Sequence, residues 1–325
     1  MKELPRWIDR VAGSGGVIAY HGVGPQPFQP VMHVAAETMR PQLEFLRSRY
    51  QIVPLMELLA RWQQGASTRG CVALTFDDAY LGVAYQAAAL LRELDLPATV
   101  FVATRQAETG DRYWWDRVER SRLAGNDEHW RSRLSDLGLP VMPASREGAG
   151  EIVRERVLTR FQGRDPWSGE AGPDDPWRSM TFPELQTLAA DDRFDFGVHT
   201  LTHPNLPALA AAEQEHEIAA SWQALRERLP RARPVIAYPY GLYDSVTIAA
   251  ARRAGMTAGV TMEGRATGSH PDPFTIPRLG VGERHGSRSI SLRMNDACRP
   301  LIVLRNRGAH PKVPRAESAR TDGER

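Results

Sequence analysis

The stretch Cys71-Val72-Ala73-Leu74-Thr75-Phe76-Asp77-Asp78 determines both the fold and the chemistry that we expect of this chain. A short apolar run of this kind is typical of a buried strand. Two adjacent carboxylates inside a strand would point to opposite faces, so that one of them would be buried on an apolar side. We therefore predict a strand that ends at Phe76 and is followed by two solvated carboxylates with different roles.

Six more apolar, β-branched runs have the same character, and segments with helical periodicity lie between most of them. The runs cover residues 17–20, 98–103, 194–198, 235–238, 257–261 and 275–279. Strands that alternate with helices form a mostly parallel sheet, which predicts an α/β fold. Seven such units suit a barrel better than an open sheet, although the same pattern also fits the latter.

The segment 105–180 interrupts this alternation with charged, helix-rich sequence that contains five of the eight tryptophans. We expect a helical insertion at the rim of a barrel domain that covers residues 1–304. Its tryptophans would either stack on sugar rings near a site or pack the insertion's own helices. Residues 305–325 carry six Lys/Arg against three Asp/Glu and few large apolar side chains, which predicts a disordered basic tail.

Charge and composition exclude several classes of function. Outside the tail, 35 Lys/Arg balance 36 Asp/Glu, so no basic field indicates a nucleic-acid partner. The charged N-terminus lacks the apolar segment of a secretory signal, and no apolar run is long enough for a transmembrane segment; we therefore expect a cytoplasmic protein. Cys71 and Cys298 are predicted to be reduced thiols. The sequence does not predict the oligomeric state.

Chemically active side chains follow four of the predicted strands. His21 follows the run 17–20, His199 and His203 follow the run 194–198, and Tyr240 follows the run 235–238. In a parallel barrel such strand ends share one mouth. His-x-x-x-His alone also fits two unrelated surface histidines, but with a carboxylate from another strand end it predicts a cation site with open positions, and thus a catalytic one.

Three motifs taken together resemble the polysaccharide deacetylase family, also called NodB-homology domains or carbohydrate esterase family 4. They are Thr75-Phe76-Asp77-Asp78, His199-Thr200-Leu201-Thr202-His203 and Ala237-Tyr238-Pro239-Tyr240-Gly241, and the resemblance covers roughly residues 15–285. It implies an irregular (β/α)7 barrel resembling a TIM barrel. It also implies a divalent metal, most often Zn²⁺, and hydrolysis of an N-acetyl or O-acetyl group on a sugar.

The resemblance further implies a role for each matched residue. These are Asp77 as the general base, Asp78 as the carboxylate ligand, His199 and His203 as the imidazole ligands, Thr200 as the hydroxyl residue that holds the histidine loop, and Tyr240 and Tyr238 as oxyanion or substrate contacts. For Tyr240 the role uses mainly its backbone N–H. Its other interpretation is an aromatic side chain packed in a turn.

Two positions depart from the family pattern. Ala237 stands where the family usually has an arginine that contacts the base. Arg278 could supply that guanidinium or a substrate contact, or it could form an unrelated salt bridge at the rim. The family's C-terminal Leu-x-His, which supplies the general acid, is also missing, and His285 lies in a Gly-rich context that does not resemble a strand end.

His21 offers a replacement for the missing acid. It ends the first predicted strand and resembles the histidine of exopolysaccharide deacetylases with circularly permuted motifs, a subgroup that also lacks the motif arginine. An imidazole has a suitable pKa for protonating a leaving amine; the other interpretation is a structural histidine. No role is assigned to the histidines that lie away from predicted strand ends, which are His33, His129, His216, His270 and His310.

Together these features predict a metal-dependent deacetylase that acts on an acetylated glycan or sugar. A second hypothesis is a cytoplasmic deacylase or deformylase of a small or lipid-linked sugar. A third, from a different class, is a catalytically inactive carbohydrate-binding barrel.

Overall fold

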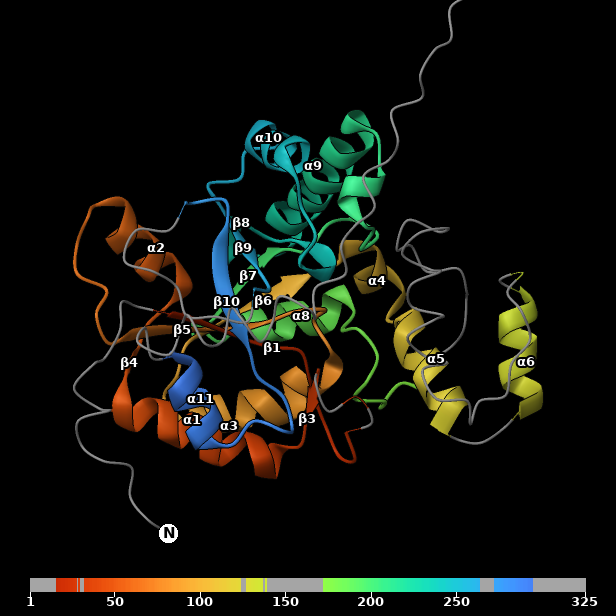
Figure 1. The fold of residues 1–325 in the computed structure, drawn as a ribbon, viewed down its shortest axis with the longest axis horizontal. Helices are drawn as coiled ribbons and strands as arrows, with labels where there is room; N and C mark the ends of the chain where they lie inside the picture. Colours follow the sequence, from red (N-terminus) through yellow and green to blue (C-terminus); the bar gives the residue numbers. More distant parts are fainter. Residues whose placement is uncertain are drawn as a thin grey trace, which may run out of the picture.

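Seven parallel strands form a closed barrel with helices packed around it (Figure 1). The computed structural model describes residues 16–27, 29, 32–123, 127–136, 138, 172–263 and 272–294. The barrel strands are β1 (Gly16–Tyr20), β5 (Cys71–Phe76), β6 (Ala98–Val102), β7 (Phe194–Val198), β8 (Ala232–Ala237), β9 (Ala258–Thr261) and β10 (Ile276–Gly280). The seven predicted strands and the α/β barrel are thus confirmed.

The first strand closes the barrel. β1 pairs in parallel with β10 on one side and with β5 on the other. In the second pairing Tyr20 lies opposite Phe76, so the residues that follow these two strands start at the same level. Three strands of two residues each were not predicted: β2 (Gly22–Val23), β3 (His33–Val34) and β4 (Gln51–Ile52).

Helices surround the barrel. In Figure 1, α9 and α10 lie together on one side, while α1, α3 and α11 lie on the other. The helices are α1 (Ala36–Arg49), α2 (Leu55–Gln63), η2 (Val83–Ala87), α3 (Ala88–Leu94), α4 (Thr104–Thr109), α5 (Trp114–Leu123), α6 (Asp127–Asp136), α8 (Phe182–Ala189), η3 (Leu206–Ala208), α9 (Ala211–Arg228), η4 (Pro239–Gly241), α10 (Ser245–Arg253) and α11 (Ser287–Met294). Across the described residues, none of these helices combines the length and apolarity that a membrane crossing requires.

Side chains alternate along each strand between two buried clusters, as the period of two of a β-strand requires. One cluster fills the barrel and includes Val17, Ala73, Phe101, Ala237 and Val260. The intervening residues face the surrounding helices and form the larger cluster. Because the barrel interior is filled with side chains, chemistry is confined to its two ends.

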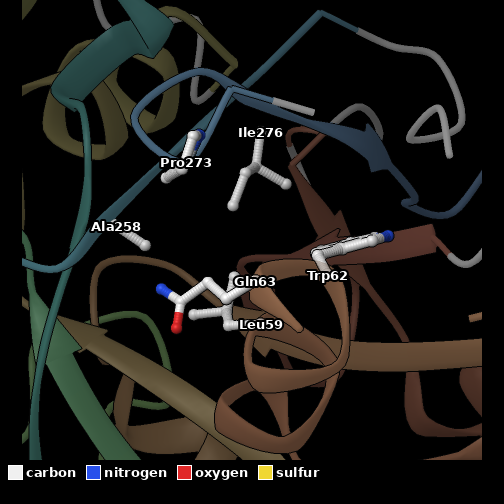
Figure 2. A pocket seen from close by; sticks show the side chains of 6 residues that line it. All are labelled: Leu59, Trp62, Gln63, Ala258, Pro273 and Ile276. Carbon is white, nitrogen blue, oxygen red and sulfur yellow. The ribbon is translucent and has the colours of Figure 1, made fainter. Parts of the chain in front are cut away.

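The N-terminal end of the barrel is covered by α2, whose apolar side chains join the interior cluster. A pocket opens beside this helix and is lined by Leu59, Trp62, Gln63, Ala258, Pro273 and Ile276 (Figure 2). Since Ala258 and Ile276 are the first residues of β9 and β10, the pocket lies at the end opposite to the predicted mouth.

Several predictions concern segments that the structure describes only in part or not at all. The predicted tail at 305–325 and Cys298 lie outside the described residues, as does much of the segment 105–180. Within that segment, α5 and α6 confirm helical structure. Cys71 is a buried free cysteine, as expected. The domain boundaries and the cytoplasmic location stay predictions.

Candidate active site

The loops that follow β5, β7 and β8 carry most of the predicted site residues, and their backbones share an unusual conformation. Seven described non-glycine residues have positive φ, and five of them lie in these loops: Asp78, Ala79, Thr200, His203 and Tyr240. A positive φ costs an L-amino acid on the order of 1–2 kcal/mol. Surrounding contacts must therefore hold these loops, and the concentration of strain marks this end of the barrel as the functional one.

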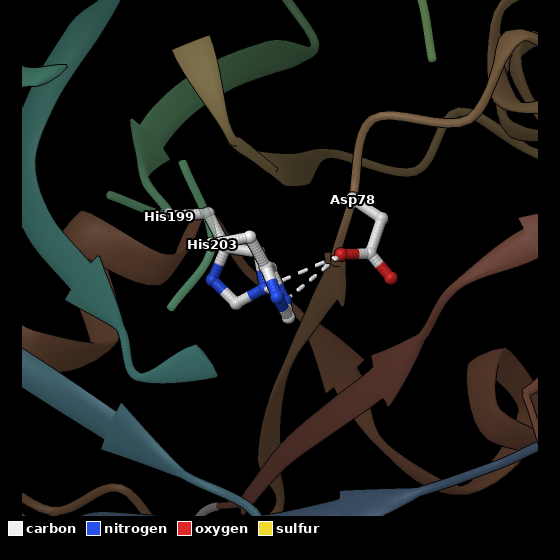
Figure 3. Close-up of side chains that lie close together, drawn as sticks. All are labelled: Asp78, His199 and His203. Atoms are coloured by element: carbon white, nitrogen blue, oxygen red, sulfur yellow. Dashed lines mark hydrogen bonds and ion pairs between the residues drawn. The ribbon is translucent and has the colours of Figure 1, made fainter. Parts of the chain in front are cut away.

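Asp78, His199 and His203 converge at one point (Figure 3). The Nε2 atoms of the two histidines are 3.1 Å apart, and each lies 3.4 Å from Oδ1 of Asp78. Ligands at about 2.0–2.1 Å from a tetrahedral ion are separated by roughly 3.3 Å. The triangle of donor atoms therefore fits a single Zn²⁺-sized cation without rearrangement.

The protonation states that the three side chains favour also suit the binding of a cation. His199 donates from Nδ1 to the carbonyl of Ala237 at 2.7 Å, which directs Nε2 toward the other two groups. Burial, followed by the charge of His199, lowers the pKa of His203 to about 3, so its imidazole is neutral at pH 7. Burial raises the pKa of Asp78, but contact with the two imidazoles outweighs that effect and lowers it.

Asp77 lies beside this triad and is paired with Arg278. The guanidinium donates from Nη1 and Nη2 to the two carboxylate oxygens, both at 2.6 Å, and the arginine is fully buried inside the barrel. Burial raises the pKa of Asp77, but the charge and hydrogen bonds of Arg278 outweigh it and hold the pKa well below its usual range. Arg278 thus makes with Asp77 the contact that the resemblance assigns to the missing arginine, and it does not lie at the rim.

His21 faces Asp77 from the end of β1. Its Nε2 lies 3.8 Å from Oδ2 of Asp77, and its side chain is 14% exposed. Burial lowers the pKa of His21 against the attraction of Asp77 and Asp78. The imidazole therefore stands next to Asp77 and is partly open to solvent, while its role as the proton donor stays a prediction.

The two tyrosines of the third motif have different surroundings. Tyr240 has φ of +58° and its ring lies 4.6 Å from that of His203, so it belongs to the site. Tyr238 does not: it is buried, its hydroxyl donates to the carbonyl of Phe274 at 3.0 Å, and its ring stacks on Tyr243. The prediction that the Tyr238 side chain contacts substrate is corrected here, because strand alternation turns it away from the barrel interior, which Ala237 faces.

The loop between the two histidines is held by one predicted and one unpredicted residue. Oγ1 of Thr200 accepts a hydrogen bond from the backbone N–H of His203 at 3.1 Å, in line with its predicted supporting role. Glu217 of α9 is 3% exposed and accepts from the N–H groups of Leu201 and Thr202, at 3.1 and 2.8 Å, and from the Thr202 hydroxyl at 2.7 Å. Sequence reasoning could have found Glu217, because a charged residue stands next to Ile218 on the buried face of a predicted helix.

Comparisons with known proteins agree with this geometry. A family model described as polysaccharide deacetylase matches residues 64–132 and 166–259, about half of the chain. The chain is 30% identical over 83 residues to the putative polysaccharide deacetylase YxkH of Bacillus subtilis, a match that covers 26% of this chain and 30% of that protein. It is 31% identical over 77 residues to a chitooligosaccharide deacetylase of Bradyrhizobium, covering 23% of this chain and 35% of that protein. The matches thus span about a third of each relative.

Solved structures share the fold at low sequence identity. The deacetylase PplD of Streptococcus pyogenes, solved in complex with acetate, aligns with a TM-score of 0.59 and 17% identity over 86% of this chain and 98% of that one. IcaB from Ammonifex degensii aligns with a TM-score of 0.59 and 18% identity over 87% and 97% of the two chains. Since the family model covers half of the sequence, the chain belongs to the polysaccharide deacetylase family, the NodB-homology or carbohydrate esterase family 4 proteins.

Proposed function

We propose that this chain is a metal-dependent hydrolase that removes N-acetyl, or O-acetyl, groups from the sugars of a polysaccharide or oligosaccharide. The observation that carries the proposal is the triangle of Asp78, His199 and His203 beside a carboxylate, Asp77, that Arg278 keeps ionised. Family membership supports the acetylated glycan as substrate.

Asp78, His199 and His203 would hold the cation. Two imidazoles and one carboxylate suit Zn²⁺, and three protein ligands leave positions open for water and substrate. A cation bound there would supply a Lewis acid that polarises the acetyl carbonyl and lowers the pKa of water toward 7.

Asp77 and His21 divide the proton transfers between them. Asp77 takes a proton from the water whose oxygen adds to the acetyl carbon, and Arg278 maintains the ionised state that accepting this proton requires. Because the pKa of Asp77 is held low, the proton does not stay there, and His21 is the neighbouring base at 3.8 Å. His21 then gives a proton to the sugar nitrogen as the C–N bond breaks, and acetate and a free amine leave.

Tyr240 is assigned to stabilise the negative charge that develops on the acetyl oxygen. Its φ is +58°, and its ring lies 4.6 Å from that of His203. We propose that its N–H faces the developing oxyanion, as the family resemblance implies; such a donor typically contributes about 2.7–4 kcal/mol. The absence of an arginine before this motif, together with His21 and Arg278, supports assignment to the permuted exopolysaccharide-type subgroup.

Replacement of the proposed base tests this function. Asp77→Asn should lower acetate release from N-acetylated glycans by at least about 10²-fold, the usual scale of a lost general base, while the protein still binds Zn²⁺. Asp195→Asn is a matched control, because Asp195 is a buried carboxylate paired with Arg231 and Arg233 near the start of β7, away from the site. It should retain activity.

The substrate panel distinguishes the alternatives. Acetylated oligosaccharides, acetylated monosaccharides, nucleotide sugars and formylated sugars are assayed side by side. Turnover confined to the small or formylated compounds would replace the proposal with a small-molecule deacylase or deformylase. Binding of glycans without hydrolysis of any compound by the Zn²⁺-loaded protein would indicate an inactive carbohydrate-binding barrel, and full activity of Asp77→Asn would remove Asp77 from the mechanism.

A further inference from the structure

The start of α5, which belongs to the segment predicted to be a rim insertion, reaches the backbone of a proposed metal ligand. The hydroxyl of Tyr113 donates to the backbone carbonyl of Asp78 at 2.8 Å, and Tyr113 is 1% exposed. Asp78 has φ of +66°, a conformation that its own sequence does not favour. This hydrogen bond therefore holds the strained backbone of Asp78, whose conformation directs its carboxylate.

The turn Tyr113–Asp116 also packs on the second proposed ligand, His203. The imidazole is surrounded by the rings of Tyr240 at 4.6 Å, Trp115 at 4.9 Å and Tyr113 at 5.8 Å. Its Nδ1 is buried and has no hydrogen-bond partner in the part of the chain that the structure describes. Metal-binding histidines are usually oriented by a hydrogen bond at the second nitrogen, as His199 is by Ala237. For His203, aromatic packing takes the place of that bond.

A buried polar network fixes this turn to the barrel. Trp115 donates from Nε1 to the hydroxyl of Tyr80 at 2.9 Å, and that hydroxyl donates to Oδ2 of Asp116 at 2.6 Å. The other oxygen of Asp116 accepts from Gln29 at 2.9 Å and lies 3.2 Å from Nε2 of His33. Asp116 and His33 are both fully buried. These bonds tie α5 both to β3 and to the loop that carries Asp78.

We propose that the turn Tyr113–Asp116 positions the metal site, with Tyr113 fixing the backbone of Asp78, Trp115 fixing the imidazole of His203, and Asp116 anchoring the turn. This rests on the proposed function, since it takes Asp78 and His203 as ligands. Helix docking alone would explain the network around Asp116. It does not explain why the side chains of Tyr113 and Trp115 end on two residues of the donor triangle.

Zinc affinity of the full-length chain tests the positioning role directly. Tyr113→Phe removes only the hydroxyl, and Trp115→Leu removes the ring, so each should weaken Zn²⁺ binding by about 10-fold or more in competition with a chromophoric chelator. Trp115→Phe restores a ring and should recover part of the affinity. The visible spectrum of the Co²⁺-loaded protein should change in the weakened variants, because it reports ligand geometry and not stability.

Tyr20→Phe is the matched control. The hydroxyl of Tyr20 is also buried and donates to Gln42 at 3.2 Å, away from the triad. This variant should keep both the Zn²⁺ affinity and the Co²⁺ spectrum. If wild-type protein binds Zn²⁺ and both Tyr113→Phe and Trp115→Leu bind it within about twofold of wild type, the positioning role is overturned while the proposed function stands. If wild-type protein binds no divalent metal, the two fall together.

Discussion

At the scale of single residues, the contact between Arg278 and Asp77 sets the charge state of the proposed base. The arginine comes from β10, two strands away from Asp77 around the barrel, and crosses the interior to form two bonds of 2.6 Å. Its Nη1 also donates to Thr75, and its guanidinium lies over the ring of Phe101. The guanidinium is planar and permanently charged, so its N–H groups fit both carboxylate oxygens at once, which a lysine ammonium would not do.

Arg278→Lys should therefore change the pH dependence of catalysis. The proposed general base Asp77 must be ionised, so activity should fall as pH falls through its pKa, which Arg278 holds below the usual range. With weaker pairing, burial raises the pKa, and the acidic limb of kcat/KM should move upward by about one pH unit or more. The measurement is the pH profile of kcat/KM.

The matched control is Arg233→Lys. Arg233 pairs with the buried Asp195 at 3.0 Å, outside the site, so its replacement should leave the profile in place. An acidic limb in Arg278→Lys that coincides with that of wild type would show that the guanidinium does not tune Asp77.

Residue-level prediction succeeded where a strand end fixed the direction of a side chain. Asp78, His199 and His203 lie in the loops that follow β5 and β7, so strand position predicted that a carboxylate would meet the two imidazoles, and the family resemblance singled out Asp78. Tyr238 failed for the converse reason: it directly follows Ala237, which faces the barrel interior, and alternation turns it outward. Arg278 could be named as a candidate, but its partner depends on which strands are neighbours in space.

At the scale of elements, the histidine loop depends on the helix that follows it. His199 and His203 flank residues whose N–H groups point to Glu217 of α9, and both Thr200 and His203 have positive φ. The carboxylate offsets part of the cost of that conformation by satisfying two backbone donors. Helix α9 thus connects the outer layer of the barrel to the proposed metal ligands.

Glu217→Ala should consequently affect both stability and metal binding. It leaves the N–H of Thr202 without its acceptor, whereas the N–H of Leu201 keeps the backbone carbonyl of residue 217 at 2.9 Å, so the free energy of unfolding should fall by about 1–3 kcal/mol. Loss of loop geometry should weaken Zn²⁺ binding by about 10-fold or more. Denaturant unfolding of the metal-free protein and Zn²⁺ titration measure the two effects.

Glu215→Ala controls for loss of a carboxylate on the same helix. The Glu215 side chain is 40% exposed and pairs with Arg253 at 2.6 Å, so its removal should change stability by no more than about 0.5 kcal/mol and leave Zn²⁺ affinity unchanged. Equal Zn²⁺ affinities for the Glu217 and Glu215 variants would show that Glu217 serves the fold and not the ligand loop.

The elements with clear periodicity were predicted, and those without it were not. Seven apolar runs became the seven barrel strands, whereas β2, β3 and β4 have two residues each and carry no repeating pattern. The docking of α5 was also missed. Its aromatics were expected on sugars or on neighbouring helices, but Tyr113 and Trp115 pack on His203 because Asp116 binds residues around 29–33 and 80, a contact between distant segments.

At the scale of the whole molecule, closure of the barrel brings the site together. The alternation of strands and helices fits either a barrel or an open sheet, and only the pairing of β1 with both β5 and β10 decides between them. That closure sets His21 after β1 beside Asp77 after β5, and brings Arg278 of β10 within reach of both. His21, Asp77 and Arg278 come from strands that are far apart in the sequence, so closure of the barrel is what brings them together.

We propose that this mouth hydrolyses acetyl groups with the help of a cation held by Asp78, His199 and His203. The most direct test measures acetate release from an N-acetylated oligosaccharide by chelator-treated protein, before and after addition of one equivalent of Zn²⁺. We predict negligible release without metal, recovery with one equivalent, and no recovery in His203→Ala. Undiminished acetate release by protein that demonstrably holds no metal would contradict the claim.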